Sequence, residues 1–278
     1  MKRRNFLIGS SALLGTSSLF ATSSNTLPKA LSKPLPIPPL LETRNGVYRL
    51  HVKEGFKKFF SQSLTKTYGI NGDFLGPTLR FKTGEQVRLH VKNELSEDVT
   101  LHWHGMEVAG KSDGGPHQVV KPKETWVTGF QVAQPASMCW YHPHTMHKTG
   151  EQVYKGLAGL IYIEDEEEAA LPLPREYGVD DIPVVLQDRR FDARGQFMYV
   201  RSMHDRMMGL QCNVFLANGE IQPYLEVEPK PLRLRILNGA NARIFQLGFD
   251  KDVSVAQIAG DSSLLPTPVP LTQGKILF

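Results

Sequence analysis

Hydrophobic and polar residues alternate along most of this chain. Within 87–92 every second residue is Val or Leu, and the residues between them are basic or histidine. The same period of two recurs in 126–132 and in 232–236. Because successive side chains of a β-strand point to opposite faces, these segments predict half-buried strands. Asn-Gly pairs bound several of these runs, at 45–46, 71–72, 218–219 and 238–239. With no long stretch at helical period, the pattern predicts an all-β sandwich or barrel.

An acidic run at 164–168, followed by an Ala- and Pro-rich stretch, separates two groups of predicted strands. Such a run is most simply a solvated connector. We expect a leader (1–41), a first β domain (42–165), a linker (166–179) and a second β domain (180–278). The second domain is short for a full sandwich, so we expect it to be incomplete.

The N-terminus has the features of an export signal. Residues 2–7 (KRRNFL) resemble a twin-arginine motif, and the apolar stretch after them is interrupted by Gly and Ser. We expect delivery to the periplasm by the twin-arginine translocation machinery; the alternative is an uncleaved membrane anchor. Removing these three basic residues from the 32 in the chain leaves 29 against 28 acidic ones. This balance gives no reason to expect binding to nucleic acid or to an anionic membrane.

Two His-x-His motifs carry the candidate chemistry: His102 with His104, and His142 with His144. On a strand, residues i and i+2 share a face, so both rings of each pair leave the same side. Imidazole suits copper, zinc and iron. A single pair of this kind is usually a surface feature or a satisfied polar pair. Two pairs 40 residues apart indicate two halves of one metal site, and a zinc hydrolase is a further alternative.

Several motifs, in order, resemble those of multicopper oxidases, in particular the bacterial periplasmic cuprous oxidases of that family. The resemblance runs from about 45 to about 265. Its motifs are TLHWHG at 100–105, DGGP at 113–116, CWYHPH at 139–144, KTGEQV at 148–153, GLAGLIYIED at 156–165, YGING at 68–72, GPTL at 76–79, DDIPV at 180–184 and LRLRILNG at 232–239.

This resemblance implies cupredoxin-like β-sandwich domains of Greek-key type and copper as the cofactor. By position, His102 matches a type 2 copper ligand, and His104, His142 and His144 match type 3 ligands. Asp113 matches an acidic residue behind the ligands that relays protons; its other interpretation is a turn former before two glycines. The implied reaction oxidises cuprous ion or a phenolic substrate and reduces dioxygen to water. Full-length relatives are mostly monomeric.

The later motifs of the family are missing. After His147 the chain has only His204, and Cys212 has no flanking histidine. We therefore expect no type 1 (blue) copper site and only four of the eight histidines of the trinuclear cluster. We interpret the chain as a truncated multicopper oxidase that is inactive in isolation. The alternative is a non-catalytic copper-binding or scaffold protein on the same fold.

Two further sets of sulfur-containing residues have competing interpretations. Cys139 is expected to be a small buried hydrophobic residue, and the alternatives are a metal ligand or a disulfide to Cys212. Met203, His204, Met207 and Met208 form a cluster of soft ligands. Thioethers favour Cu(I), which allows a contact with substrate copper, whereas an adaptable loop or core filler is the simpler role.

Overall fold

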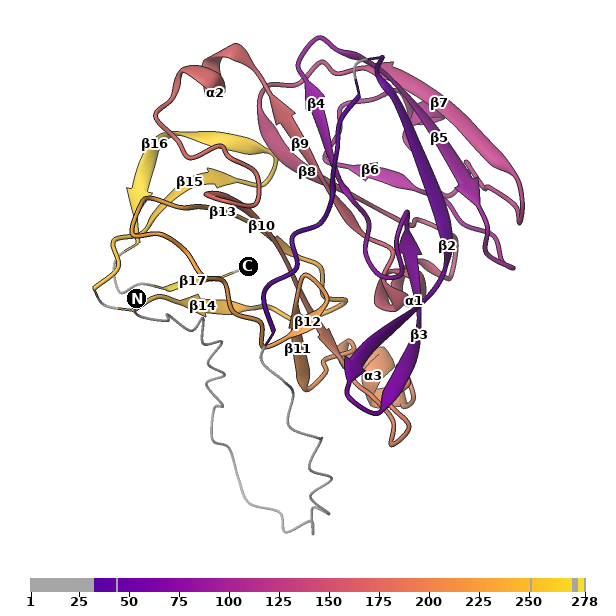
Figure 1. Ribbon diagram of the computed structural model, residues 1–278. Coiled ribbons are helices and arrows are strands. Elements are labelled where there is room, and N and C mark those ends of the chain that lie inside the picture. The colour runs from indigo at the N-terminus through magenta and orange to yellow at the C-terminus, as the bar shows by residue number, and fades with distance from the viewer. Residues whose placement is uncertain (1–32, 44, 251, 272–274, 278) are drawn as a thin grey trace.

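The structure is a computed structural model that describes residues 33–43, 45–250, 252–271 and 275–277. Strands dominate it and its helices are short (Figure 1). The all-β class predicted from the alternation is therefore confirmed. The predicted export signal lies outside the described residues.

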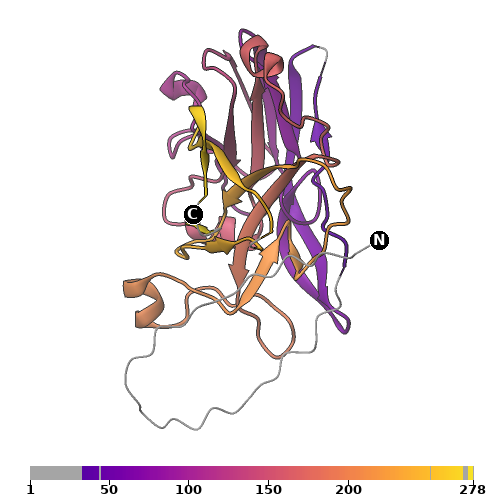
Figure 2. The same cartoon turned by 90° about the vertical axis from the view of Figure 1, so that its left-hand side faces the viewer.

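Two sheets form a sandwich in the N-terminal part (Figure 2). One sheet has the order β3-β2-β5-β7 and the other β1-β4-β9-β8-β6. The strands are β1 (Leu40–Leu41), β2 (Val47–Phe60), β3 (Ser63–Ile70), β4 (Thr78–Lys82), β5 (Gln86–Asn93), β6 (His102–His104), β7 (Thr125–Gln131), β8 (Ser137–His142) and β9 (Gly159–Glu164). Parallel pairing of β2 with β5 and of β4 with β9 joins strands that are distant along the chain.

The core between these sheets is built by the residues of the period-2 rows. Val87, Leu89 and Val91 of β5 are fully buried, and the residues between them reach solvent in part or in full. Aromatic rings cross the sandwich: the Trp103 indole of β6 stacks on Trp126 of β7 with ring centroids 6.2 Å apart. These contacts fix β6, one of the two strands with a His-x-His motif, against the opposite sheet.

The C-terminal part contains a third sheet, of four strands, with the order β12-β11-β10-β13. Its strands are β10 (Asp181–Arg189), β11 (Val214–Ala217), β12 (Glu220–Ile221) and β13 (Arg233–Asn238). Two further pairs follow: β14 (Gln246–Gly248) with β17 (Lys275–Leu277), and β15 (Ala256–Gly260) with β16 (Ser263–Pro270). The predicted turn at Asn218 and Gly219 joins β11 to β12, with both residues at positive φ as such hairpins require.

β9 is buried on both of its faces. Ile161 and Ile163 belong to the sandwich core, whereas Leu160 and Tyr162 pack with Val185 of β10. The five-stranded sheet therefore packs against both parts of the molecule, and the same sheet holds β6 and β8.

The acidic run at 164–168 differs from the prediction of a simple solvated connector. Its second half opens helix α2 (Glu166–Ala170), and the Asp165 side chain caps that helix by accepting from the Glu168 amide. Glu168 is buried and pairs with Arg233 of β13. The end of the run is internal because Glu168 pairs with the buried Arg233. The local sequence does not show this pairing.

The arginines of β13 also depart from the simple alternation. The strand forms as predicted, but Arg233 and Arg235 are buried while Leu234 and Ile236 are only partly so. Arg235 donates to both carboxylate oxygens of Asp181 on β10, at 2.8 to 3.0 Å. Its guanidinium carbon also lies 4.0 Å from the Tyr162 ring centroid. A buried charge is tolerated here because it is paired and hydrogen-bonded.

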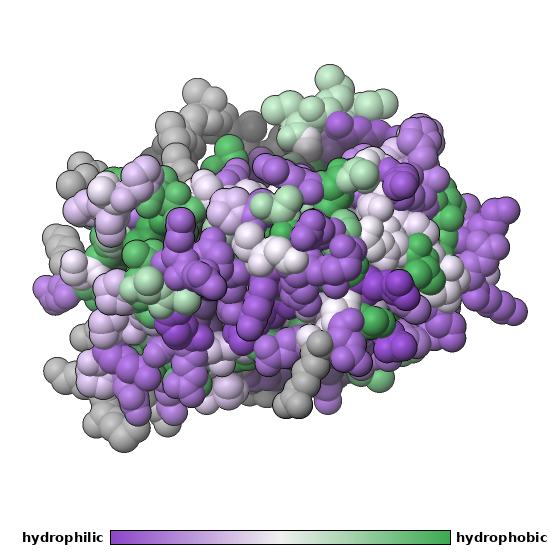
Figure 3. Space-filling model, turned by 90° about the horizontal axis from the view of Figure 1, so that it is seen from above, coloured by the Kyte–Doolittle hydropathy of each residue, from purple (hydrophilic) through white to green (hydrophobic). Residues whose placement is uncertain are grey.

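The remaining helices are α1 (Thr149–Lys155), α3 (Met203–Met208) and the short 3₁₀ helix η1 (Gly110–Ser112). Among the described residues, no helix combines the length and the apolar character that crossing a bilayer requires. Cys139 and Cys212 are free thiols and both are buried, as expected for Cys139. Seen from above, hydrophilic and hydrophobic residues are mixed over the surface (Figure 3).

Candidate metal centre

The two His-x-His motifs lie side by side because β6 and β8 pair antiparallel. Their register places His102 opposite His142, Trp103 opposite Tyr141, and His104 opposite Trp140. Trp103 and Tyr141 are fully buried in the sandwich core. Residues directly opposite each other share a face, so the histidines project from the other side of the sheet.

His144 joins this group just after β8 ends. Its backbone amide donates to the Thr100 hydroxyl at 2.7 Å, and the Thr145 hydroxyl accepts from the Thr100 amide at 3.0 Å. This cross-link ties the segment after β8 to the segment before β6. The His102 ring lies centrally, with centroid distances of 5.6 Å to His104, 5.5 Å to His142 and 5.5 Å to His144.

The structure thus brings together all four histidines singled out in the sequence. One ligand nitrogen from each of His102, His104 and His142 lies within 4.8 Å of the other two. The His104 Nδ1 and His142 Nε2 atoms are 3.1 Å apart. Such convergence of imidazole nitrogens is the arrangement that a shared metal requires.

Hydrogen bonds orient two of these rings. The His102 Nδ1 lies 2.9 Å from the Asp113 carbonyl oxygen and 3.2 Å from the Asp113 carboxylate. The His142 Nδ1 lies 2.7 Å from the carbonyl oxygen of Pro143. In each case Nδ1 donates, and the Nε2 lone pair stays available for a metal, which is the usual way that metal-binding histidines are held.

The environment favours the neutral form of two of the rings, those of His142 and His104. The pKa of His142 is lowered to about 3, mainly by burial and also by the neighbouring His102, against the opposing effect of the Pro143 carbonyl. Burial, and then His102, also lower the pKa of His104. Neutral imidazole is the form that binds metal. The donor set of four imidazoles with supporting acceptors therefore fits copper.

Asp113 is positioned by the turn in which it lies. The Trp103 indole donates to the Ser112 carbonyl at 2.9 Å, which ties η1 to β6. Gly114 follows at positive φ, and a Cβ there would lie 1.8 Å from the Leu101 carbonyl oxygen. Only glycine permits this close approach. Both sequence interpretations of Asp113 therefore describe its surroundings: it precedes a tight turn and it contacts a candidate ligand.

Sequence reasoning missed Trp140 and the β15–β16 hairpin. The Trp140 ring stacks on His142 with centroids 4.1 Å apart and lies 5.1 Å from His104. Its position two residues before His142 was the available signal, because this spacing places both on one strand face. At the hairpin tip, the Ser262 hydroxyl contacts the Cys139 sulfur at 3.8 Å. The charge of Asp261 acts on His104 and opposes the lowering of its pKa. Cys139 and Ser262 are 123 residues apart in the sequence, so no local pattern predicts this contact.

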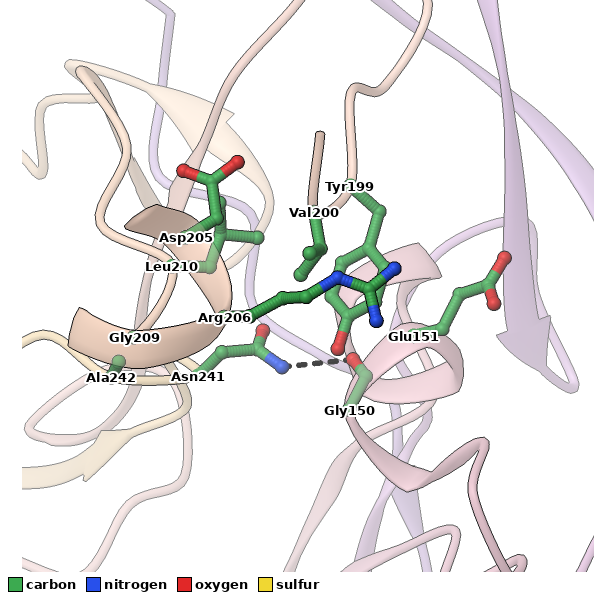
Figure 4. A pocket seen from close by; sticks show the side chains of 10 residues that line it. All are labelled: Gly150, Glu151, Tyr199, Val200, Asp205, Arg206, Gly209, Leu210, Asn241 and Ala242. Carbon is green, nitrogen blue, oxygen red and sulfur yellow. Dashed lines mark hydrogen bonds between the residues drawn. The ribbon is translucent and has the colours of Figure 1, made fainter. Parts of the chain in front are cut away.

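A separate cavity of about 650 Å³ lies between α1 and the segment that contains α3. Gly150, Tyr199, Arg206 and Asn241 contribute to its lining, and the Asn241 amide donates to the Gly150 carbonyl at 2.8 Å (Figure 4). No candidate metal ligand lines this cavity, so it is distinct from the histidine cluster.

Comparison with known proteins identifies the family. Residues 52–168 match the family model described as "Multicopper oxidase". The chain is 38% identical over 275 residues to cell division protein FtsP of Xenorhabdus nematophila, covering 98% of this chain and 57% of that protein. It is 40% identical over 218 residues to multicopper oxidase mco of Staphylococcus epidermidis, covering 78% and 48%.

Among solved structures, the laccase-like multicopper oxidase CueO from an Ochrobactrum species superposes with a TM-score of 0.83 at 41% identity. The superposition covers 88% of this chain and 55% of that one. The chain spans about half the length of the relatives it matches. Together with the observed sandwich, this likeness supports the cupredoxin-like fold class. The chain belongs to the multicopper oxidase family.

Proposed function

We propose that this chain is a copper-dependent oxidoreductase whose family reaction oxidises cuprous ion or a phenolic substrate and reduces dioxygen to water. The convergence of four imidazoles from β6 and β8 carries the proposal. Relatives named as a multicopper oxidase and as a laccase-like oxidase support it. The family membership also argues against the zinc-hydrolase alternative.

In this proposal His102 binds a type 2 copper, and His104, His142 and His144 bind type 3 coppers. When bound, copper supplies the electron transfer to dioxygen. Asp113 holds the proton on the His102 Nδ1, so that the lone pair of the other ring nitrogen stays free, and its carboxylate is placed to relay protons. Trp140 covers one face of the His142 ring and shields it from water.

We further propose that the residues of this chain form only half of a trinuclear site and no type 1 site. The four histidines are half of the eight that the family's cluster uses. Neither Cys139 nor Cys212 has a flanking histidine in the sequence. On this proposal the chain by itself binds copper but does not oxidise substrate.

The test is a Cu(II) titration of the chain and of a His102→Ala, His142→Ala double variant. Loss of most Cu(II) uptake in the double variant is expected, because both central ligands are gone. A His90→Ala variant is the matched control, since His90 lies on β5 outside the cluster. Undiminished uptake by the double variant would contradict the site.

A copper-binding scaffold without catalysis is the second candidate. Several relatives of high coverage, FtsP of Xenorhabdus nematophila among them, carry the name cell division protein, which does not refer to oxidation. The two candidates differ in oxygen consumption with cuprous ion or a phenol, measured on the chain within its complete protein. Copper-dependent consumption that is lost in His144→Ala supports the oxidase, and its absence with copper bound supports the scaffold.

Export through the twin-arginine machinery to the periplasm is part of the proposal, as is the division into cupredoxin-like units at 42–165 and 180–278. Arg3 and Arg4 carry the export signal. Changing both to Lys should leave the precursor in the cytoplasm, as measured by cell fractionation. Unchanged export would show that another route is used.

A further inference from the structure

Helix α3 exposes three methionines to solvent. The exposed fractions are 69% for Met203, 77% for Met207 and 66% for Met208, and His204 beside them is exposed as well. Single exposed apolar residues are ordinary, but a contiguous group on one short helix indicates a binding surface. The exposure also rules out the role of core filler that the sequence left open.

These four residues share one side of the helix, which we call the α3 face. At about 100° per residue, their positions span roughly 140° of arc around the helix axis. Met203 and Met207 are separated by four residues, and so are His204 and Met208. Side chains at this spacing are neighbours, with Cβ atoms about 5–6 Å apart.

The opposite side of α3 is anchored to the protein. Asp205 is buried and pairs with Arg190, with oxygen–nitrogen distances of 2.8 and 3.3 Å. It also completes a capping box with Ser202. Asp205 and Arg206 line the cavity beside α1, and no residue of the α3 face does (Figure 4). The helix is therefore held by one side while its sulfur- and nitrogen-bearing side stays free.

We propose that the α3 face binds a cuprous ion through its thioether and imidazole groups. Soft thioether ligands select Cu(I) over harder divalent ions. The methionine side chain has three rotatable bonds, so sulfurs at i and i+4 can turn toward a common point. Because Met203 and Met207 carry no charge, they favour a monovalent ion. This site goes beyond the proposed copper-oxidase function and does not depend on it.

The experiment titrates the full chain with Cu(I) under anaerobic conditions against a chromogenic chelator, with Ag(I) as a redox-inert second probe. It is done in the His102→Ala, His142→Ala background, so the histidine cluster cannot contribute. One equivalent should bind tightly. Replacing the three α3 methionines with Leu should abolish it, and each single Met→Leu change should weaken it by about tenfold or more.

Leucine keeps the apolar volume, so the variants should fold as the parent does. Met146→Leu is the matched control, because Met146 is 60% exposed but lies outside α3. NMR of the methionine methyl groups in the unmutated chain gives a readout that needs no variant: only the three α3 signals should shift with one equivalent of Ag(I). Equal binding by the triple variant, or shifts confined to other methionines, would overturn the site. Neither result bears on Cu(II) uptake by the histidine cluster.

Discussion

At the scale of single residues, Asp113 contacts His102 through two different oxygens. The backbone carbonyl is the nearer acceptor, at 2.9 Å, and the carboxylate lies at 3.2 Å. The carbonyl fixes the ring orientation in any variant. The carboxylate adds a negative charge behind the ring, and such a charge behind a metal-binding histidine strengthens metal binding. The two contributions can therefore be separated by mutation.

We predict that Asp113→Ala weakens Cu(II) binding by about 10- to 100-fold, because the charge behind His102 is lost. The free energy of unfolding should change little, since the backbone carbonyl and the turn at Gly114 remain. Isothermal titration with Cu(II) measures the first effect and thermal denaturation the second. Asp252→Ala, a change at an exposed acid, is the control. Unaltered affinity would mean that the carbonyl alone prepares the ring.

How far the sequence predicts this site depends on how local each contact is. His102 and His104 share a face through the spacing of a strand, so their juxtaposition is readable from six residues. Asp113 comes from a motif in the same stretch of chain. Asp261 reaches the site through a hairpin more than a hundred residues away. No period or motif encodes that approach, because tertiary packing alone creates it.

At the scale of elements, β13 shows how packing overrides a simple alternation. The row of Leu and Arg in 232–236 predicts arginines in water. The structure instead buries Arg233 against Glu168 of α2 and Arg235 against Asp181 of β10. The strand itself was predictable because its period is local. Which face is internal depends on acids from other elements, and these are not visible in the strand's own sequence.

We predict that Arg235→Met destabilises the chain by about 3–5 kcal/mol, because Asp181 is left as an unpaired buried charge. Only 2% of the Asp181 side chain is exposed, so water cannot replace the lost partner. Adding Asp181→Leu to the same chain should recover most of the stability, since the pair is then replaced by apolar groups. Denaturant unfolding of the single and double variants measures this. If Arg235→Met alone leaves the free energy of unfolding unchanged, the pair is not a stabilising link between β10 and β13.

At the scale of the whole molecule, two distant contacts connect the five-stranded sheet that holds the histidines to the C-terminal part. β9 packs on both of its faces, and the tip of the β15–β16 hairpin reaches Cys139 on β8. A Cβ on Gly105, directly after His104, would lie 2.6 Å from the Ser262 hydroxyl. The glycine thus permits the hairpin to close on the turn behind the candidate ligands. Cys139 is consequently enclosed, whereas Cys212 is buried separately, beside Tyr154.

The surroundings of those cysteines determine the colour of the copper-loaded chain. The intense blue of the family arises from a cysteine thiolate bound to copper. Burial raises the thiol pKa of both Cys139 and Cys212, so each remains protonated at neutral pH. The side chains within hydrogen-bonding reach of Cys139 are those of Gln134, Ser137 and Ser262. The group within hydrogen-bonding reach of the Cys212 sulfur is the Tyr154 hydroxyl, at 3.5 Å. Neither thiol has a histidine beside it in these contacts.

We therefore predict that the chain loaded with Cu(II) shows no intense visible thiolate-to-copper band, measured by absorption spectroscopy at several copper equivalents. Without a thiolate site there is no entry point for substrate electrons, so oxygen uptake with cuprous ion or a phenol should stay at the rate of the protein-free control. Cys139→Ser and Cys212→Ser variants should give the same spectrum as the unmutated chain. A strong band that disappears in one of these variants would identify that cysteine as a copper ligand and refute the proposal that this chain forms no type 1 site.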